Sequence, residues 1–261
     1  MFIVADNIQI TNKLLEKAVR KEDPYPIQQL VKKCESAGAE AIDINSGPVS
    51  QNPGKMAFLV QVIQDVTDLP VLLDSANPKA IEAGLKASNK TAIINGVSLE
   101  PVKLESILPL AKEYGTDIIG YLLNPDSSVP PDMTGRLNVA VELFKKCLDA
   151  GIDTEKLIID PIVAPVIWQD GNIQDMEVLN VIRQLPDLLG FPVRTIAGLS
   201  NLTTGKGIKE KKLLLERTYL PMLAASGLNY ILMNVFHLES VKTAVACREL
   251  MSNGIFTWES V

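Results

Sequence analysis

Short apolar runs alternate with longer amphipathic segments along the whole chain. Ile, Val and Leu dominate these runs, which is typical of parallel strands that are covered on both faces. The runs predict eight strands, at residues 2–5, 40–45, 71–74, 91–95, 117–123, 156–160, 193–198 and 230–233. The intervening segments have helical spacing and predict helices at 30–37, 55–66, 79–87, 102–114, 136–150, 175–189, 211–226 and 240–252. Eight such units favour an α/β fold, a (β/α)8 TIM barrel formed by one domain over residues 1–261.

Glycines separate several predicted helices from the strands that follow them. Gly38, Gly115, Gly151 and Gly227 each stand between a helical segment and a strand. Glycine at the C′ position of a helix adopts a positive φ at little cost, so we interpret these residues as helix ends. A doubly wound open sheet is the alternative fold. It normally has a Gly-x-Gly-x-x-Gly phosphate turn after an early strand, and the sequence contains none.

Length and composition narrow the possible classes of function. The 261 residues carry a formal net charge of −6 and 5% aromatic residues, which disfavours nucleic-acid binding. His237 is the one histidine, so a His-rich zinc site is excluded. Cys34, Cys147 and Cys247 form no Cys-x-x-Cys motif, and we interpret them as buried thiols. The chain begins with a strand-like segment, and no apolar run approaches the ~18 residues of a membrane span, so we expect a cytoplasmic protein without membrane contact.

Polar residues gather where the predicted strands end. In a barrel these ends share one face, on which barrel enzymes build their sites. The residues at or just beyond the strand ends are Asp6, Asn7, Asp43, Asn45, Asp74, Asn95, Asn124, Asp160, Asn201 and Asn234. Carboxylates and amides without nearby cations suit a neutral heterocycle with N–H donors and ring acceptors, such as a reduced pterin. A divalent metal held by the carboxylates is a competing interpretation that the spacing leaves open.

Several segments together resemble one known family. They are residues 41–45 (AIDIN), 72–75 (LLDS), 79–86 (KAIEAGLK), 92–95 (AIIN), 159–161 (IDP) and 198–201 (GLSN), and also Arg217-Thr218. With these motifs the chain resembles the methyltetrahydrofolate:corrinoid-protein methyltransferases over nearly its whole length. That family is part of the pterin-binding TIM-barrel group, which is related to dihydropteroate synthase.

The resemblance implies roles for individual residues. It implies that Asn201, in the turn after the seventh strand, is catalytic through a hydrogen bond near N5 of the folate. It implies that Gly198 and Ser200 shape this turn. The residues implied to bind the pterin or folate are Asp43, Asp74, Asn95, Asp160, Gly198, Ser200 and Asn201.

The resemblance also implies a reaction and its partners. A methyl group moves between N5 of tetrahydrofolate and the cobalt of a corrinoid carried by a separate protein. Transfer from methylcorrinoid to tetrahydrofolate, in a demethylation pathway, is slightly favoured over methyl transfer to a corrinoid/iron-sulfur protein in the reductive acetyl-CoA pathway. The chain is expected to bind no metal, to form a homodimer and to come from an anaerobic bacterium.

Two other hypotheses remain, a dihydropteroate-synthase-like enzyme and a non-catalytic folate-binding barrel. Dihydropteroate synthases place a lysine in the seventh-strand turn, whereas here Lys206 comes five residues after Asn201 and is expected to face solvent. The family's Gly-Glu-Arg-Ile-Asn segment is replaced by Ala-Asp-Asn-Ile-Gln, so the roles of Asp6 and Asn7 are open. Trp168 and His237 have no assigned role.

Overall fold

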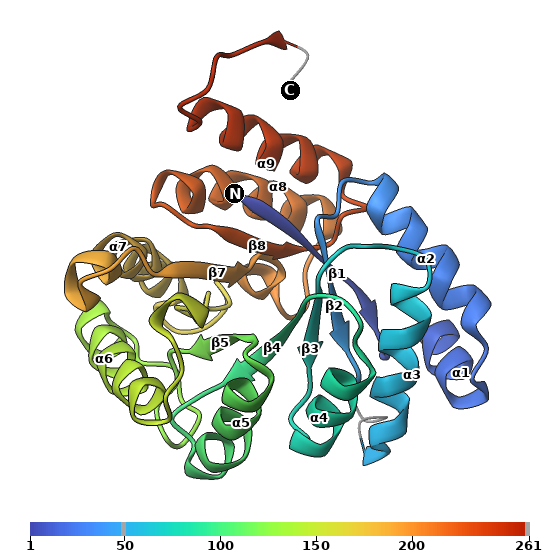
Figure 1. The fold of residues 1–261 in the computed structure, drawn as a ribbon. Helices are drawn as coiled ribbons and strands as arrows, with labels where there is room; N and C mark the ends of the chain where they lie inside the picture. Colours follow the sequence, from blue (N-terminus) through green and yellow to red (C-terminus); the bar gives the residue numbers. More distant parts are fainter. Residues whose placement is uncertain (48–50, 259–261) are drawn as a thin grey trace.

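Eight parallel strands close into a barrel in the computed structural model, which describes residues 1–47 and 51–258 (Figure 1). Each strand pairs with its neighbours in the chain, and β1 also pairs with β8. The strands are β1 Phe2–Gln9, β2 Ala41–Asn45, β3 Val71–Asp74, β4 Ala92–Val97, β5 Asp117–Tyr121, β6 Leu157–Asp160, β7 Arg194–Gly198 and β8 Tyr230–Met233. The predicted (β/α)8 barrel is therefore confirmed.

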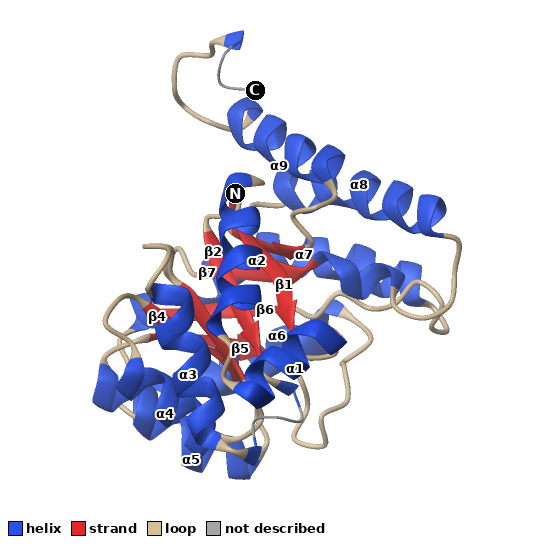
Figure 2. Cartoon of the chain, turned by 90° about the vertical axis from the view of Figure 1, so that its right-hand side faces the viewer, coloured by secondary structure: helices blue, strands red, loops and turns tan. Residues whose placement is uncertain are grey.

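Helices surround the barrel and follow its strands (Figures 1 and 2). They are α1 Lys13–Lys21, α2 Pro24–Ser36, α3 Pro53–Gln64, α4 Pro78–Ala87, α5 Pro101–Tyr114, α6 Met133–Asp149, α7 Gly171–Leu189, α8 Lys209–Ala225 and α9 Leu238–Leu250. Two short 3-10 helices, η2 Thr154–Lys156 and η3 Leu199–Thr203, precede β6 and follow β7. The Gly- and Pro-containing segment 47–54 is typical of a loop in the sequence, and its residues 48–50 lie outside the described residues. No helix in the described ranges is long and apolar enough to cross a membrane.

The first strand and helix differ from the prediction. β1 continues to Gln9 instead of ending at Ala5, because the chain keeps its pairing with β2 across a register shift between Ala5 and Ile8. Helix α1 was not predicted, although Leu15, Ala18 and Val19 are buried at helical spacing. The Asn12 side chain begins α1 by accepting a hydrogen bond from the backbone N–H of Leu14.

Two layers of side chains fill the barrel interior. The lower layer is an apolar cluster of Val4, Ala41, Leu72, Ile93, Ile119, Ile158 and Ile196. Strand side chains alternate between faces, so the residues two positions further along also point inward, at the carboxyl end of the strands. The polar ones among these residues are Asp6, Asp43, Asp74, Asn95, Tyr121 and Asp160. Together with Asn45, two positions beyond Asp43, they are named here the polar layer.

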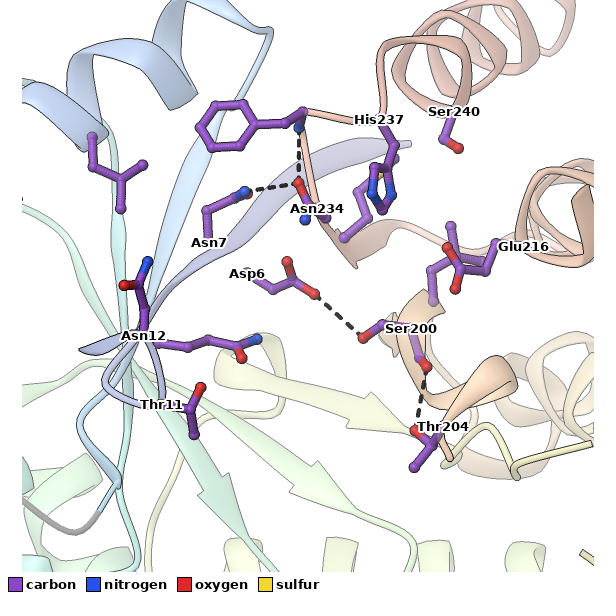
Figure 3. Close-up of a pocket in the computed structure, with 15 residues that line it drawn as sticks. Asp6, Asn7, Thr11, Asn12, Ser200, Thr204, Glu216, Asn234, His237 and Ser240 are labelled. Atoms are coloured by element: carbon purple, nitrogen blue, oxygen red, sulfur yellow. Dashed lines mark hydrogen bonds between the residues drawn. The ribbon is translucent and has the colours of Figure 1, made fainter. Parts of the chain in front are cut away.

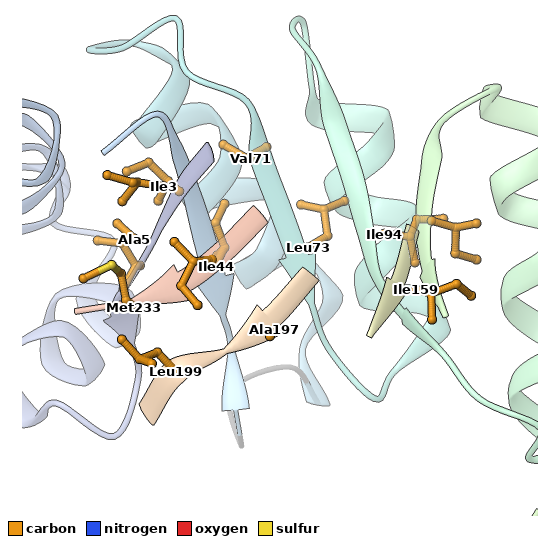
Figure 4. Close-up of a cluster of buried hydrophobic side chains, with 14 of the residues drawn as sticks. Ile3, Ala5, Ile44, Val71, Leu73, Ile94, Ile159, Ala197, Leu199 and Met233 are labelled. Atoms are coloured by element: carbon orange, nitrogen blue, oxygen red, sulfur yellow. The ribbon is translucent and has the colours of Figure 1, made fainter. Parts of the chain in front are cut away.

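The opposite faces of the strands are apolar and pack under the helices. Figure 4 shows part of this outer core, which includes Ile3, Ala5, Ile44, Leu73 and Ile94. The predicted helix ends are also present, since Gly115 caps α5 with a φ of 55°. All three cysteines are free and buried, as expected.

Candidate active site

Strand register aligns two sets of residues within the polar layer. Asn45 on β2 pairs with Asp74 on β3, which pairs with Asn95 on β4. Tyr121 on β5 pairs with Asp160 on β6. Four of the predicted pterin-binding positions, Asp43, Asp74, Asn95 and Asp160, therefore lie in one inward-facing group.

Amide–carboxylate hydrogen bonds organise this group. Asn95 Nδ2 donates to Asp43 Oδ1 over 2.8 Å, and Tyr121 OH donates to Asn95 Oδ1 over 2.6 Å. Asn45 Nδ2 donates to Asp74 Oδ2 over 2.6 Å. Asp43 is only 2% exposed and Asn95 only 6%. The side chains are thus held in fixed orientations, with further acceptor positions left on the carboxyl groups.

Burial makes the carboxyl groups hard to ionise. It raises the pKa of Asp43 well above its usual value, and the charge of Asp74 adds to this increase. It also raises the pKa of Asp74, although the hydrogen bond from Asn45 opposes the increase. Burial raises the pKa of Asp160 to about 7, against the hydrogen bond that the Ile162 backbone N–H donates to Oδ1 over 2.8 Å. A ligand with N–H donors would offset the cost of holding these charges together.

A cavity of about 590 Å³ opens beside the polar layer, between the ends of β1, β7 and β8. We call it the β1/β8 cavity; it is lined by Asp6, Asn7, Gln9, Thr11, Asn12, Leu30, Leu199, Ser200, Thr204, Glu216, Met233, Asn234, Phe236, His237 and Ser240. Figure 3 shows Asp6 pointing into it, with Ser200 opposite. Ser200 Oγ donates to Asp6 Oδ2 over 3.3 Å. Burial raises the pKa of Asp6 to about 6.

The turn that contains Gly198, Ser200 and Asn201 includes the short helix η3. Asn201 is exposed, and its side chain folds back over Gly198. A Cβ atom at Gly198 would lie 3.1 Å from Asn201 Nδ2, so glycine allows this close approach. Lys206 is exposed in the loop after η3, as expected, and it does not line the β1/β8 cavity.

Three of the polar strand-end residues, Asn7, Asn124 and Asn234, form hydrogen bonds that connect segments of the chain. Asn7 Nδ2 donates to Asn234 Oδ1 over 2.8 Å, and Asn7 Oδ1 accepts from the Val235 backbone N–H, which ties β1 to the segment after β8. Asn124 Nδ2 donates to Ser128 Oγ over 2.9 Å within its own turn. These hydrogen bonds hold neighbouring segments together at the strand ends, and Asn7 and Asn234 line the β1/β8 cavity as well.

His237 and Trp168 lie near the site without joining the polar layer. His237 lines the β1/β8 cavity, and burial lowers its pKa. Trp168 is 47% exposed in the loop between β6 and α7. Neither observation assigns a catalytic role to these side chains.

Tyr121 is the main residue of the site that sequence reasoning missed. After burial, the charges of Asp74, Asp160 and Asp43 raise its pKa, so these carboxyl groups lie around it. Its position could have been found from the alternation of β5, because Ile119 is inward and Tyr121 follows two residues later. A tyrosine at a strand end stands outside the pattern of Asp and Asn residues from which the site was predicted.

A buried arginine supports the loops beside the site. Arg136 is fully buried; its Nε donates to Pro130 O over 2.9 Å and its Nη1 to Gln174 O over 3.1 Å. Asp175 Oδ1 accepts from the Ala164 backbone N–H over 2.9 Å. These contacts connect α6 and α7 to the loops that follow β5 and β6.

The competing metal interpretation has little geometric support. Within residues 1–47 and 51–258, no three His, Cys, Asp or Glu side chains are grouped so that they could hold a metal ion. Asp43 and Asp74 instead accept hydrogen bonds from amides.

Comparisons with known proteins agree with a pterin site. A family profile described as pterin binding enzyme matches residues 11–234. A protein of Methanocaldococcus jannaschii described as uncharacterized is 29% identical over 131 residues, which are 50% of this chain and 24% of that protein. The methylcorrinoid:tetrahydrofolate methyltransferase of Eubacterium limosum is 19% identical over 257 residues, covering 97% of this chain and 92% of that enzyme.

A solved structure has the same fold. Dihydropteroate synthase of Xanthomonas albilineans with 4-aminobenzoic acid matches with a TM-score of 0.68 at 19% identity. The match covers 97% of this chain and 93% of the synthase chain. At this identity the likeness shows the barrel architecture and not the reaction.

Proposed function

This chain belongs to the pterin-binding enzyme family, and we propose that it transfers a methyl group between N5 of tetrahydrofolate and the cobalt of a separate corrinoid protein. The matched residues include β2 to β8 and thus most of the polar layer. Similarity to the Eubacterium limosum enzyme over 97% of this chain supports the same reaction. We favour the direction from methylcorrinoid to tetrahydrofolate, as that enzyme's name indicates.

The observation that carries the proposal is the polar layer itself. A carboxylate such as Asp74 can accept two parallel N–H bonds from the amidine-like edge of a pterin. Asn95 has both a donor and an acceptor, as a lactam edge requires. Among the described residues, no lysine or arginine lines the adjoining β1/β8 cavity, which favours a neutral heterocycle over a phosphate ligand.

The residues have distinct roles in this reaction. Asp43, Asp74, Asn95 and Asp160 hold the pterin ring, so that N5 faces the open end of the barrel. The Asn201 amide lies near N5 and stabilises its charged form by hydrogen bonding, since an amine leaves or attacks efficiently only in the correct protonation state. The corrinoid protein supplies or receives the methyl group at this open end.

A dihydropteroate-synthase-like condensation is the second candidate, because a synthase shares the fold. That reaction releases an anionic pyrophosphate, which needs a cation in the site. Lys206 is exposed and lies outside the β1/β8 cavity, so the structure offers this reaction less support. We also propose that the protein forms a homodimer, is cytoplasmic and binds no metal of its own.

Methyl exchange tests the proposal. Purified protein is mixed with cob(I)alamin and methyltetrahydrofolate, and with methylcobalamin and tetrahydrofolate, and the cobalt absorbance is followed. We expect transfer in both directions and no condensation of a dihydropterin pyrophosphate with 4-aminobenzoate. Tight folate binding without methyl exchange would refute the methyltransferase and leave the non-catalytic folate-binding barrel.

A pair of asparagine variants tests the assigned role of the η3 turn. Asn201→Ala should lose turnover far more than folate affinity, because its hydrogen bond matters most when N5 is charged. Asn124→Ala is the matched control, since Asn124 also follows a strand but its side-chain amide donates to Ser128 within its own turn. Equal losses of turnover and affinity in Asn201→Ala would contradict the role near N5.

A further inference from the structure

Asp6 is a buried carboxyl group with little to stabilise its charge. It is 7% exposed at the carboxyl end of β1. Among the residues that the structure describes, Ser200 Oγ is the one group that donates a hydrogen bond to the Asp6 side chain from another side chain, at 3.3 Å. None of the ion pairs found in the described ranges includes Asp6. Keeping such a group buried costs stability, and this is typical of functional carboxyls.

Its neighbours place Asp6 between the two parts of the proposed site. Asp43 on β2 is proposed to hold the pterin, and the charge of Asp6 raises the pKa of its carboxyl group. On the other side Asp6 contacts Ser200, the residue before Asn201. Figure 3 shows Asp6 directed into the space that Ser200 and Glu216 also face.

The other titratable groups around Asp6 come from three elements. Glu216 on α8 raises the pKa of Asp6 by its charge and accepts a hydrogen bond from Thr203. Cys34 on α2 is close enough for the charge of Asp6 to raise its pKa further after burial. His237, after β8, has its pKa lowered by burial and raised by Glu216. None of these groups supplies a fixed positive charge to Asp6.

We propose that Asp6 is the acid–base residue of the methyl transfer, which takes up the proton that N5 of tetrahydrofolate loses when it is methylated. This inference rests on the proposed function and adds a residue to it. Asp6 would approach N5 from the β1/β8 cavity, which it lines, whereas Asn201 would approach it from the η3 turn.

The step balances without another reactant. The N5 lone pair forms the new N–C bond, and the cobalt–carbon bond breaks with its electron pair left on cobalt, which is reduced from Co(III) to Co(I). The N5 proton passes to the Asp6 carboxylate, and the β1/β8 cavity allows its release to water. In the reverse direction, protonated Asp6 returns the proton to N5, which makes the amine a better leaving group.

The pH dependence distinguishes acid–base chemistry from a structural role. Transfer to tetrahydrofolate needs the carboxylate, so its single-turnover rate should rise with pH, with an inflection near 6. Transfer from methyltetrahydrofolate needs the carboxylic acid, so its rate should fall through the same region. Asp6→Asn should lose both inflections and about 100-fold or more of the rate, with folate affinity retained.

Two further variants keep the test valid if Asp6→Asn folds poorly. Ser200→Ala removes a hydrogen bond that lowers the pKa of Asp6, so the inflection should move to higher pH. Glu216→Gln removes a charge that raises this pKa, so the inflection should move to lower pH. Opposite shifts from two substitutions are not expected if Asp6 only supports the fold.

Asp170→Asn is the matched control, because Asp170 is exposed in a loop at the same end of the barrel and asparagine tolerates its positive φ of 58°. It should leave the rate and the pH profile unchanged. The role of Asp6 alone is overturned if the wild type exchanges methyl groups and Asp6→Asn keeps the wild-type pH profile. It is also overturned if the wild type exchanges methyl groups and neither Ser200→Ala nor Glu216→Gln shifts the inflection. Absence of exchange by the wild type overturns the proposed function and this role with it.

Discussion

Replacing Asn95 by alanine removes the central hydrogen-bonding side chain of the polar layer. Asn95 donates to Asp43 Oδ1 at 2.8 Å and accepts from Tyr121 OH at 2.6 Å. Both bonds are enclosed, with Asp43 only 2% exposed. The substitution therefore leaves one buried acceptor and one buried donor without a partner.

The expected loss of stability follows from these two groups. A buried polar group left unpaired costs about 1–3 kcal/mol, so Asn95→Ala should lower the free energy of unfolding by roughly 2–6 kcal/mol. Tyr121→Phe removes only the second bond and should cost about 1–3 kcal/mol. At about 2–4 °C per kcal/mol, Asn95→Ala should melt at least 4 °C below the wild type.

Urea unfolding of the two variants and the wild type, at pH 6 and pH 8, measures these losses. The Asn95 hydrogen bond lowers the pKa of Asp43, so its removal should raise this pKa further and cost the variant additional stability only at a pH where Asp43 is ionised in the folded wild type. Folate affinity should fall in Asn95→Ala and fall less in Tyr121→Phe. A loss below 1 kcal/mol for Asn95→Ala with unchanged folate affinity would refute the reasoning about the polar layer.

Three other substitutions test the surroundings of the site. Burial raises the pKa of Asp160 to about 7, so the wild type loses stability as the pH rises from about 4 to 7. Asp160→Asn should remove this loss, so in urea unfolding the variant should be more stable than the wild type at pH 8 but not at pH 4. Arg136→Met should lower the melting temperature and increase proteolysis of the loops after β5 and β6, because the buried Pro130 carbonyl and the part-buried Gln174 carbonyl lose the hydrogen bonds from Arg136; unchanged proteolysis would contradict a supporting role. Gly198→Ala should reduce turnover more than stability, measured by kcat and melting temperature, because its Cβ would displace the Asn201 amide; unchanged kcat would argue against that contact.

The architecture followed from the sequence because it depends on local and repetitive features. The predicted strands at 71–74 and 230–233 coincide with β3 and β8, and the glycine at 115 ends α5 with a left-handed conformation. Continuous apolar runs and glycine helix ends have the same meaning in every βα unit, so eight repetitions reinforce one another. The prediction was weakest where this pattern is interrupted, at the polar residues of β1 and in the lysine-rich α1.

Only part of the candidate site could be predicted from the sequence. Strand-end position and the family resemblance identified Asp43, Asp74, Asn95 and Asp160, which the structure brings together. The contact between Tyr121 and Asn95 joins residues 26 positions apart, and that between Asp6 and Ser200 joins residues 194 positions apart. No local pattern in the sequence specifies such pairs.

The sequence by itself determined the barrel and the acidic, amide-rich chemistry at the carboxyl ends of its strands, because periodicity and composition act locally. Tertiary structure decided which polar residues bond to one another across distant segments, as Asn7 and Asn234 do. It also decided the protonation behaviour of Asp6 and Asp43, because a pKa depends on burial and on charges that distant segments bring close. Closing the barrel is the physical event that converts separate strand ends into one site.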